Sequence, residues 1–291
     1  MPPAIKAVAI FATGGSEPMP QHTPNVTVSR SATVCNPRSA AEGVSASILA
    51  PTMAVAIYLL LAAYPEHIAA LRDGQIIWRD GTTMPLDDGR GRKSHPEWLN
   101  APDVADMFDQ AYIPGPAAAP PAPDIDPGRA RNTAFFAKIY GDCRAGTVKP
   151  NLVDVAWLPR TSGTKLKVTS VNGVAKRLTA VSRALDALPS KFDSYLIPPA
   201  GTYNCRTIAG TDRLSAHGFG IAIDIATKDA DYWRWSKPGP NRRPVWRNRV
   251  PEEIVAIFEA HGFIWGGKWH HYDTMHFEFR PELLPPTAPL E

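Results

Sequence analysis

Hydrophobic residues of the C-terminal half recur with the period of a helix. Five of them follow an Asn-Gly turn at alternating intervals of four and three residues: Val174, Leu178, Val181, Leu185 and Leu188. This spacing predicts a helix with one apolar stripe over residues 174–188, which Pro189 ends. The stripe is expected to face the core.

Other segments predict further helices and short strands. Helices are expected over residues 132–140 and from Pro251, where a proline and two acids precede an apolar stripe and His261-Gly262 ends the helix. Strands are expected over residues 166–171, 195–197, 221–225 and 276–279, the last half-buried. This mixture predicts an α+β domain, with helices packed on a small, mostly antiparallel sheet.

The N-terminal residues have a different character. Residues 1–43 are rich in Ser, Thr, Pro and Ala, which predicts a poorly ordered extension. Residues 44–65 carry no charge and contain a long apolar run. They are read as a secretory signal or an anchor, which would place the protein in the periplasm or at the cell wall. Two alternatives remain: Met53 is the true start, or residues 53–71 form a buried helix.

A proline- and alanine-rich stretch divides the rest of the chain. Residues 114–125 read as a stiff linker and as the main domain boundary. Before it, residues 66–113 predict a small accessory segment with a strand and turn near residues 75–81 and a short helix within 102–112. After it, residues 126–291 would form the catalytic domain.

Charge and cysteine content narrow the function. The 291 residues carry a net charge of only +3, which is too mild to argue for a nucleic-acid partner. Three cysteines form no C-x-x-C pair, so a structural zinc site is not expected. In an oxidising compartment Cys143 and Cys205 could form a disulfide, whereas in the cytosol they would be free thiols.

The first chemically informative segment covers residues 215–224, with the pattern S-x-H-x-x-G-x-A-x-D. Its glycines suit a tight turn, and residues 221–225 read as a buried strand that carries Asp224. A turn and a strand can bring His217 and Asp224 to one centre. From this segment alone, an ordinary hydrogen-bonded Asp is as good an interpretation as a metal ligand.

The second segment, at residues 273–278, has the pattern D-x-x-H-F-E. Five of the eight histidines of the chain lie between His217 and His276, which weakens their interpretation as unrelated surface residues. Two imidazoles and one carboxylate suit zinc, and three protein ligands leave one position for water, as in catalytic sites. Asp273 can then lie close to His276 without being a ligand, where a general base must be.

These residues resemble a known family. The two patterns, together with G-F-x-W-G-G-x-W at residues 262–269, resemble the zinc D-alanyl-D-alanine carboxypeptidases and L-alanyl-D-glutamate endopeptidases of bacterial and phage cell-wall metabolism. The resemblance covers roughly residues 168–284. It implies the fold shared by these peptidases and the hedgehog signalling domain, with a zinc cleft. The implied substrate is a peptidoglycan stem peptide.

Position by position, the resemblance implies that His217, Asp224 and His276 bind one Zn²⁺ and that Asp273 is the general base. The family also stabilises the carbonyl oxygen with an arginine upstream of the first motif, so a cation is expected there.

The upstream arginine is read as Arg206, with Arg213 as the alternative, and His271 as a site histidine near the substrate. Substrate contacts are expected from Ser215, Tyr203 and Trp269, although a turn hydroxyl is an equally good role for Ser215.

Two questions stay open at this level. The scissile bond is either the terminal D-Ala-D-Ala bond or the L-Ala-D-Glu bond, and the sequence does not decide between them. The alternative to an enzyme is a non-catalytic zinc module that binds the wall or a protein, against which the presence of Asp273 argues. A monomer is expected, with contact to a membrane only through the N-terminal segment.

Overall fold

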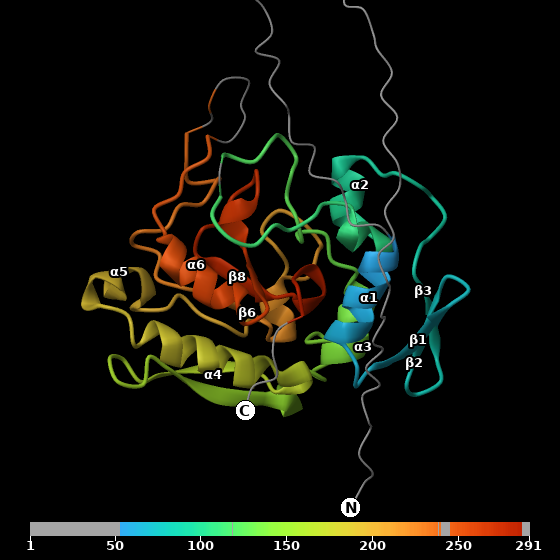
Figure 1. Cartoon of the computed structure of the whole chain (residues 1–291), viewed down its shortest axis with the longest axis horizontal. Helices are drawn as coiled ribbons and strands as arrows, with labels where there is room; N and C mark the ends of the chain where they lie inside the picture. Colours follow the sequence, from blue (N-terminus) through green and yellow to red (C-terminus); the bar gives the residue numbers. More distant parts are fainter. Residues whose placement is uncertain (1–52, 118, 238, 240–244, 287–291) are drawn as a thin grey trace, which may run out of the picture. The chain divides into compact units, whose positions relative to one another are not determined.

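Three small antiparallel sheets and the helices packed against them carry the candidate site (Figure 1). The structure is a computed structural model, and it describes residues 53–117, 119–237, 239 and 245–286. The predicted α+β class is confirmed at this coarse level, although the strands form three sheets instead of one. The predicted extension over residues 1–43 lies outside the described residues.

The sheet that carries the site has the order β6-β8-β7, with β6 at Ala222–Asp224, β7 at Phe263–Trp265 and β8 at His276–Phe279. All four residues of β8 are buried, although its alternating pattern predicted a half-buried strand. The reason is that both faces are covered. The Phe277 ring stacks on Phe258 of α6 (Glu252–Glu259) with centroids 3.8 Å apart, and Glu278 pairs with buried arginines.

A second sheet pairs β4 (Leu152–Trp157) with β5 (Thr164–Thr169), and α4 (Val174–Leu185) packs along this hairpin (Figure 1). Leu178, Val181 and Leu185 are all buried, so the predicted apolar stripe of this helix faces the core. The helix ends three residues before Leu188, which packs against the core from the turn that follows.

The N-terminal part forms a helix and a third sheet. Helix α1 spans Met53–Ala63, and the sheet has the order β1-β2-β3 with strands at Ile68–Arg72, Gln75–Trp78 and Thr83–Pro85. The alternative of one helix over residues 53–71 is therefore wrong in its second half. Pro65 disfavours helical geometry in the residue before it, and the chain turns into β1.

The remaining elements are short. Three α-helices are α2 (His95–Asn100), α3 (Thr133–Tyr140) and α5 (Asp193–Leu196). Single turns of 3-10 helix lie at Ala105–Phe108, Lys149–Asn151, Val171–Gly173, Ser190–Phe192, Ala216–Phe219, Gly266–Lys268 and Pro281–Leu283. The strand predicted over residues 195–197 is wrong, because one helical turn there buries Leu196 against the core.

Residues on the two sides of the proline- and alanine-rich stretch share one core, and Ser47–Glu291 forms one compact unit. Two buried tyrosines connect the sides directly. Tyr64 donates a hydrogen bond to Glu282 at 2.7 Å, and Tyr112 donates one to Glu259 at 2.5 Å. The structure therefore differs from the predicted domain boundary at residues 114–125, because the accessory segment packs onto the rest.

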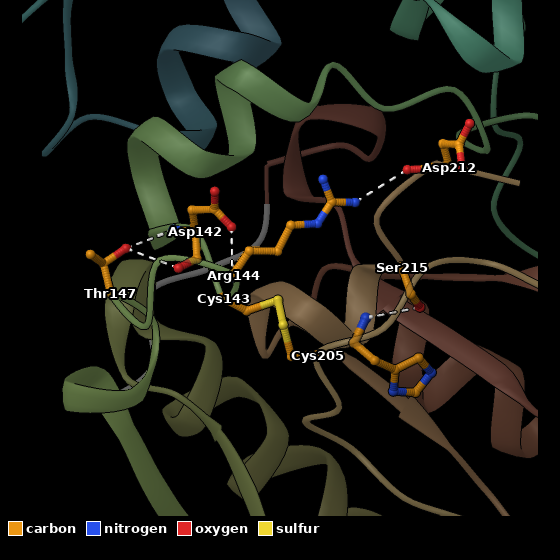
Figure 2. Close-up of a disulfide and its surroundings, with 8 residues drawn as sticks. Asp142, Cys143, Arg144, Thr147, Cys205, Asp212 and Ser215 are labelled. Atoms are coloured by element: carbon orange, nitrogen blue, oxygen red, sulfur yellow. Dashed lines mark hydrogen bonds between the residues drawn. A yellow bond between two sulfur atoms is a disulfide. The ribbon is translucent and has the colours of Figure 1, made fainter.

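The disulfide between Cys143 and Cys205 is present, as the sequence analysis considered for an oxidising compartment (Figure 2). It joins the loop after α3 to the segment that leads into the first motif. Arg144, the neighbour of Cys143, also donates a hydrogen bond to the Asp212 carbonyl oxygen in that segment at 3.2 Å. Two links thus hold the approach to His217 against the region of α3.

Helix α1 is the described part of the predicted signal or anchor. None of the helices in the described ranges is long and apolar enough to cross a membrane. Residues 44–52 of the predicted segment lie outside the described part of the chain.

The two faces of α1 predict opposite effects of substitution. Leu60 is fully buried, so Leu60→Ala should lower the free energy of unfolding by about 2–5 kcal/mol through a lost apolar contact and a cavity. Tyr58 is 61% exposed, so Tyr58→Ala should change it by less than about 0.5 kcal/mol. Denaturant unfolding of purified protein, with the N-terminus checked by mass spectrometry, measures both. Equal stability of the two variants would mean that α1 is not part of the fold.

Candidate metal centre and active site

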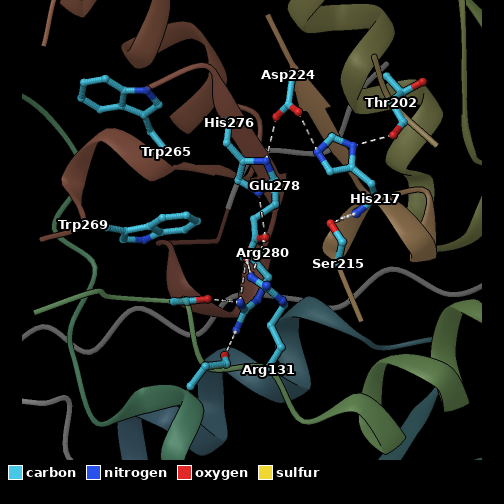
Figure 3. Close-up of polar contacts among 12 residues, drawn as sticks. Arg131, Thr202, Ser215, His217, Asp224, Trp265, Trp269, His276, Glu278 and Arg280 are labelled. Carbon is cyan, nitrogen blue, oxygen red and sulfur yellow. Dashed lines mark hydrogen bonds and ion pairs between the residues drawn. The ribbon is translucent and has the colours of Figure 1, made fainter. Parts of the chain in front are cut away.

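The three predicted metal ligands come together at the pairing of β6 with β8 (Figure 3). Asp224 and His276 are directly opposite each other in the antiparallel register, and Asp224 Oδ1 lies 2.9 Å from His276 Nδ1. Nε2 of His217 lies 3.2 Å from Asp224 Oδ2. One ligand atom from each of the three residues lies within 4.8 Å of the other two.

The 3-10 helix Ala216–Phe219 presents His217, and the S-x-H-x-x-G pattern explains its geometry. The Ser215 hydroxyl accepts a hydrogen bond from the His217 backbone N–H at 3.4 Å, so it has the role of a turn hydroxyl. Gly220 closes the turn with φ of 71°, and an added Cβ would lie 3.0 Å from the backbone nitrogen of Thr169. A side chain there would be strained and crowded.

Hydrogen bonds on the far side of each imidazole set which nitrogen faces the centre. Nδ1 of His217 lies 2.5 Å from the Thr202 carbonyl oxygen, which can only accept. In the neutral ring Nε2 therefore keeps its lone pair and faces Asp224 Oδ2, and no contact of this buried atom within the described residues has the geometry of a hydrogen bond. Nε2 of His276 lies 3.1 Å from Glu278 Oε2, so Nδ1 faces Asp224.

Glu278 is the buried carboxylate behind His276. It pairs with Arg131 at 2.9 Å and with Arg280 at 3.0 Å, and its side chain is fully buried (Figure 3). Burial alone would raise the pKa of Glu278, but the charge of Arg131 and the hydrogen bond with His276 hold it well below its usual value. Glu278 thus stays ionised and accepts the His276 N–H.

This arrangement fits a divalent cation. The Asp224 carboxylate lies between two ring nitrogens, and two acceptors at this distance repel each other unless a proton or a cation lies between them. Without a cation the proton is on His276: burial disfavours the charged ring, but hydrogen bonds to Asp224 and Glu278 raise the pKa of His276 to about 10. A donor set of two imidazoles and one carboxylate suits zinc.

Asp273 lies on the turn before β8. The segment with the pattern G-F-x-W-G-G-x-W, residues 262–269, positions it. The Asp273 backbone N–H donates to the Gly266 carbonyl oxygen at 3.0 Å. An added Cβ at Gly266 would lie 2.6 Å from the Asp273 carbonyl oxygen, so only glycine allows this approach. Burial raises the pKa of Asp273 to about 6, with His276 opposing and Asp224 assisting the shift. Its buried Oδ1 has no hydrogen-bond partner among the described residues.

The two candidate arginines have different surroundings. Arg206 is exposed, and its guanidinium donates a 3.4 Å hydrogen bond to the Thr207 carbonyl oxygen. Arg213 is half-buried, and its Nε has no hydrogen-bond partner in the described ranges. Burial and the charges of Arg131 and Arg129 lower the pKa of Arg213 to about 10. A poorly compensated cation of this kind is suited to bind an anion, which favours Arg213 over Arg206.

Two of the expected substrate contacts, Tyr203 and Trp269, have different surroundings. The Tyr203 hydroxyl is buried and lacks a hydrogen-bond partner within the described residues. Trp269 is only 4% exposed, donates its indole N–H to the Pro127 carbonyl oxygen, and lies 5.7 Å from the His276 ring. Trp269 therefore forms a wall behind the metal centre, and little of it is available to a substrate.

His271 lies in a different cluster from the three ligands. Its Nδ1 is 2.8 Å from a carboxylate oxygen of Asp126, and its potential ligand atom groups with those of His95 and Asp124. The structure does not place it with His217, Asp224 and His276. Its expected position near the substrate stays a prediction.

The sequence analysis did not identify Glu278, Arg131 or Arg280 as parts of the site. A signal for Glu278 was present, because it follows His276 by two residues in a strand and so points to the same face. Arg280 follows Glu278 by two residues and shares this signal. Arg131 had none, since it approaches from a segment 147 residues away.

Glu278→Gln is expected to weaken zinc binding roughly 10–100-fold, because the carboxylate that orients His276 and keeps its Nε2 protonated is lost. Competition with a chromophoric chelator measures the affinity. Glu282→Gln is the matched control: Glu282 is equally buried and binds Arg280 at 2.5 Å, but it does not contact His276. An equal loss of zinc affinity in both variants would show that general destabilisation, not the contact with His276, is responsible.

Comparison with known proteins gives one match, which covers the residues of this site. Residues 209–279 match a family model described as D-alanyl-D-alanine carboxypeptidase, and the match includes His217, Asp224, Asp273 and His276. No curated protein and no solved structure matches the chain. The match confirms the resemblance predicted from the two motifs: residues 209–279 are similar to the D-alanyl-D-alanine carboxypeptidase family.

Proposed function

We propose that this protein hydrolyses an amide bond in peptidoglycan stem peptides with one zinc ion. The observation that carries the proposal is the convergence of His217, Asp224 and His276 next to Asp273, a buried carboxylate with an unpartnered oxygen. The family match supports a peptidase that acts on peptidoglycan. A zinc cleft in a hedgehog-like fold belongs to the same proposal.

Each residue has a defined task in this reaction. Zinc held by the three ligands would supply Lewis acidity, which polarises the scissile carbonyl and acidifies water. Asp273 takes the proton from the attacking water and returns it to the leaving amine nitrogen. Its pKa of about 6 leaves it mostly ionised at neutral pH and still able to donate a proton. Arg213 stabilises the negative charge that develops on the carbonyl oxygen.

The residues around Asp273 favour an anionic peptide as substrate. The backbones of Tyr232 and Asp273 pair in an isolated antiparallel bridge, and Trp235 from the same loop is 61% exposed. Arg234 in this loop donates to the Ala209 carbonyl oxygen at 2.9 Å, close to the segment of Arg213. Aromatic surface beside cations suits a stem peptide with free carboxylates. Together with the family description, it favours a D-Ala-D-Ala carboxypeptidase over an endopeptidase.

The disulfide supports an exported protein, since such bonds persist in oxidising compartments. We therefore place the protein in the periplasm or at the cell wall, where its proposed substrate is found.

Asp273→Ala should retain zinc and lose activity by at least about 10²-fold, because the proton acceptor is removed and the ligands remain. Release of D-Ala from a pentapeptide muropeptide, followed by mass spectrometry, measures the rate, and the wild-type rate should fall as the pH drops below about 6. A peptide cut between L-Ala and D-Glu would identify an endopeptidase. A wild-type protein that holds zinc and cuts neither bond would be a non-catalytic zinc module.

The two arginines predict a second contrast. Arg213→Gln should lower kcat/KM by about 10²–10³-fold, because a cation facing the developing oxyanion is lost. Arg206→Gln should change kcat/KM by less than about threefold, because Arg206 is exposed and bonds only to a neighbouring carbonyl. The opposite ranking in the same muropeptide assay would restore Arg206 to the role that the sequence first suggested.

A further inference from the structure

A second cluster of imidazoles and carboxylates lies away from the proposed zinc ligands. It combines His95 of α2, Asp124 at the end of the proline- and alanine-rich stretch, Asp126 directly after it, and His271 before the second motif. One potential ligand atom from each of His95, Asp124 and His271 lies within 4.8 Å of the others. No step of the proposed hydrolysis uses these residues.

Asp126 organises the cluster from the protein interior. Its side chain is fully buried, and the groups around it are hydrogen-bond donors. Its Oδ1 accepts from the His271 backbone N–H at 2.9 Å, and its Oδ2 lies 2.8 Å from His271 Nδ1 and 3.0 Å from His95 Nε2. Arg129 adds a positive charge 3.5 Å from Oδ1. Both imidazoles therefore donate to Asp126.

These hydrogen bonds determine which nitrogen of each ring carries the lone pair. In a neutral ring the nitrogen opposite the donating N–H carries a lone pair. For His95 that atom is Nδ1, and it lies 3.6 Å from Asp124 Oδ1, another acceptor. For His271 the corresponding atom is Nε2. An acceptor facing an acceptor needs a proton or a cation between them, as at the first centre.

We propose that His95, Asp124 and His271 bind a second divalent transition-metal ion. Imidazole and carboxylate ligands suit Zn²⁺, Co²⁺ or Ni²⁺ better than Ca²⁺ or Mg²⁺. Asp126 stands behind the two imidazoles as Glu278 stands behind His276, which is the carboxylate-histidine-metal arrangement.

The proposed site is accessible from solvent, and its ligand atoms can come close enough to bind an ion. The side chains of His95 and His271 are 18% and 20% exposed, and that of Asp124 is 60% exposed. His95 and Asp124 also line a cavity of about 820 Å³. Bonds of about 2.0–2.2 Å require the ligand atoms to approach more closely than 4.8 Å. The exposed Asp124 carboxylate can supply this movement by rotation.

A nearby group of three aspartates differs from the proposed site because a lysine already neutralises it. Asp87, Asp88 and Asp103 also lie close enough together to hold an ion. Lys93 already occupies the space between two of them, with Nζ 2.9 Å from Asp88 and 3.0 Å from Asp103. A bound amine neutralises that group, whereas no lysine or arginine of the described residues forms an ion pair with Asp124.

The proposed ion would connect two parts of the chain. His95 belongs to the N-terminal segment and His271 to the segment of the second motif, and the proline- and alanine-rich stretch lies between them in sequence. An ion that binds only the folded chain stabilises it in proportion to the logarithm of its free concentration. Metal should therefore raise the thermal stability through this site, whether or not the protein cuts peptides.

The test is the metal stoichiometry of the purified full chain. Metal-free protein is dialysed against buffered Zn²⁺, and the zinc bound per chain is measured by elemental mass spectrometry. Wild-type protein should hold two ions per chain, and His95→Gln and His217→Ala should each hold one. His261→Gln is the control and should keep two, because His261 contacts the Ile257 carbonyl oxygen and belongs to neither cluster.

A wild-type stoichiometry that His95→Gln leaves unchanged, whether one ion or two, would overturn the proposal. A single wild-type ion that is lost in His95→Gln and kept in His217→Ala would support the second site and count against the first. Circular dichroism checks that the variants fold. Asp124→Asn provides a second variant at an exposed position that the core does not need, and it should weaken the second ion at least tenfold. Unchanged binding in Asp124→Asn would remove Asp124 from the site.

The metal-dependent rise in Tm should persist in His217→Ala and decrease in His95→Gln. Zinc binding at the second site is measured without substrate, so failure of the proposed hydrolysis does not affect this result.

Discussion

The antiparallel pairing of β6 with β8 is the constraint on which the candidate site depends. It places Asp224 opposite His276, two residues that are 52 positions apart in the chain. A slip of one strand by one residue would turn its side chain to the other face and separate Asp224 from His276. The register is held because the residues behind the site, Ile223 and Phe277, are fully buried and fit only one face of the sheet. The proposed metal centre thus depends on the hydrophobic packing that lies behind it.

Buried charge extends from this pairing toward the N-terminal part of the chain. His276 contacts Glu278, Glu278 pairs with Arg280, and Arg280 pairs with Glu282. Tyr64, the residue after α1, donates to Glu282. Isolated charges at such depth would be very unfavourable, and each is stabilised by its opposite neighbour. Loss of one member leaves an unpaired buried charge, so the N-terminal helix and the metal centre depend on the same network.

Sequence patterns predicted what depends on near neighbours in the chain. The turn that carries His217, a helix that begins at Val174 and the general α+β class follow from glycine positions and hydrophobic period, and these are local properties. Long-range contacts were not predictable in this way. Nothing local shows that His271 faces Asp126, 145 residues away, or that Arg213 is half-buried while Arg206 is exposed.

The proline- and alanine-rich stretch illustrates the same limit in a different way. Its composition favours a stiff linker, and composition alone cannot tell whether such a segment separates two bodies or crosses the surface of one. Tyr112 and Gly115 decide the matter, since both donate hydrogen bonds to the Glu259 carboxylate of α6. The Tyr112 hydroxyl also accepts from the Trp265 backbone N–H at 2.9 Å, next to the glycines that position Asp273. Residues that precede the stretch therefore support the strand and turn from which the proposed base projects. The N-terminal segment is for this reason better understood as part of the frame of the site than as an appended module.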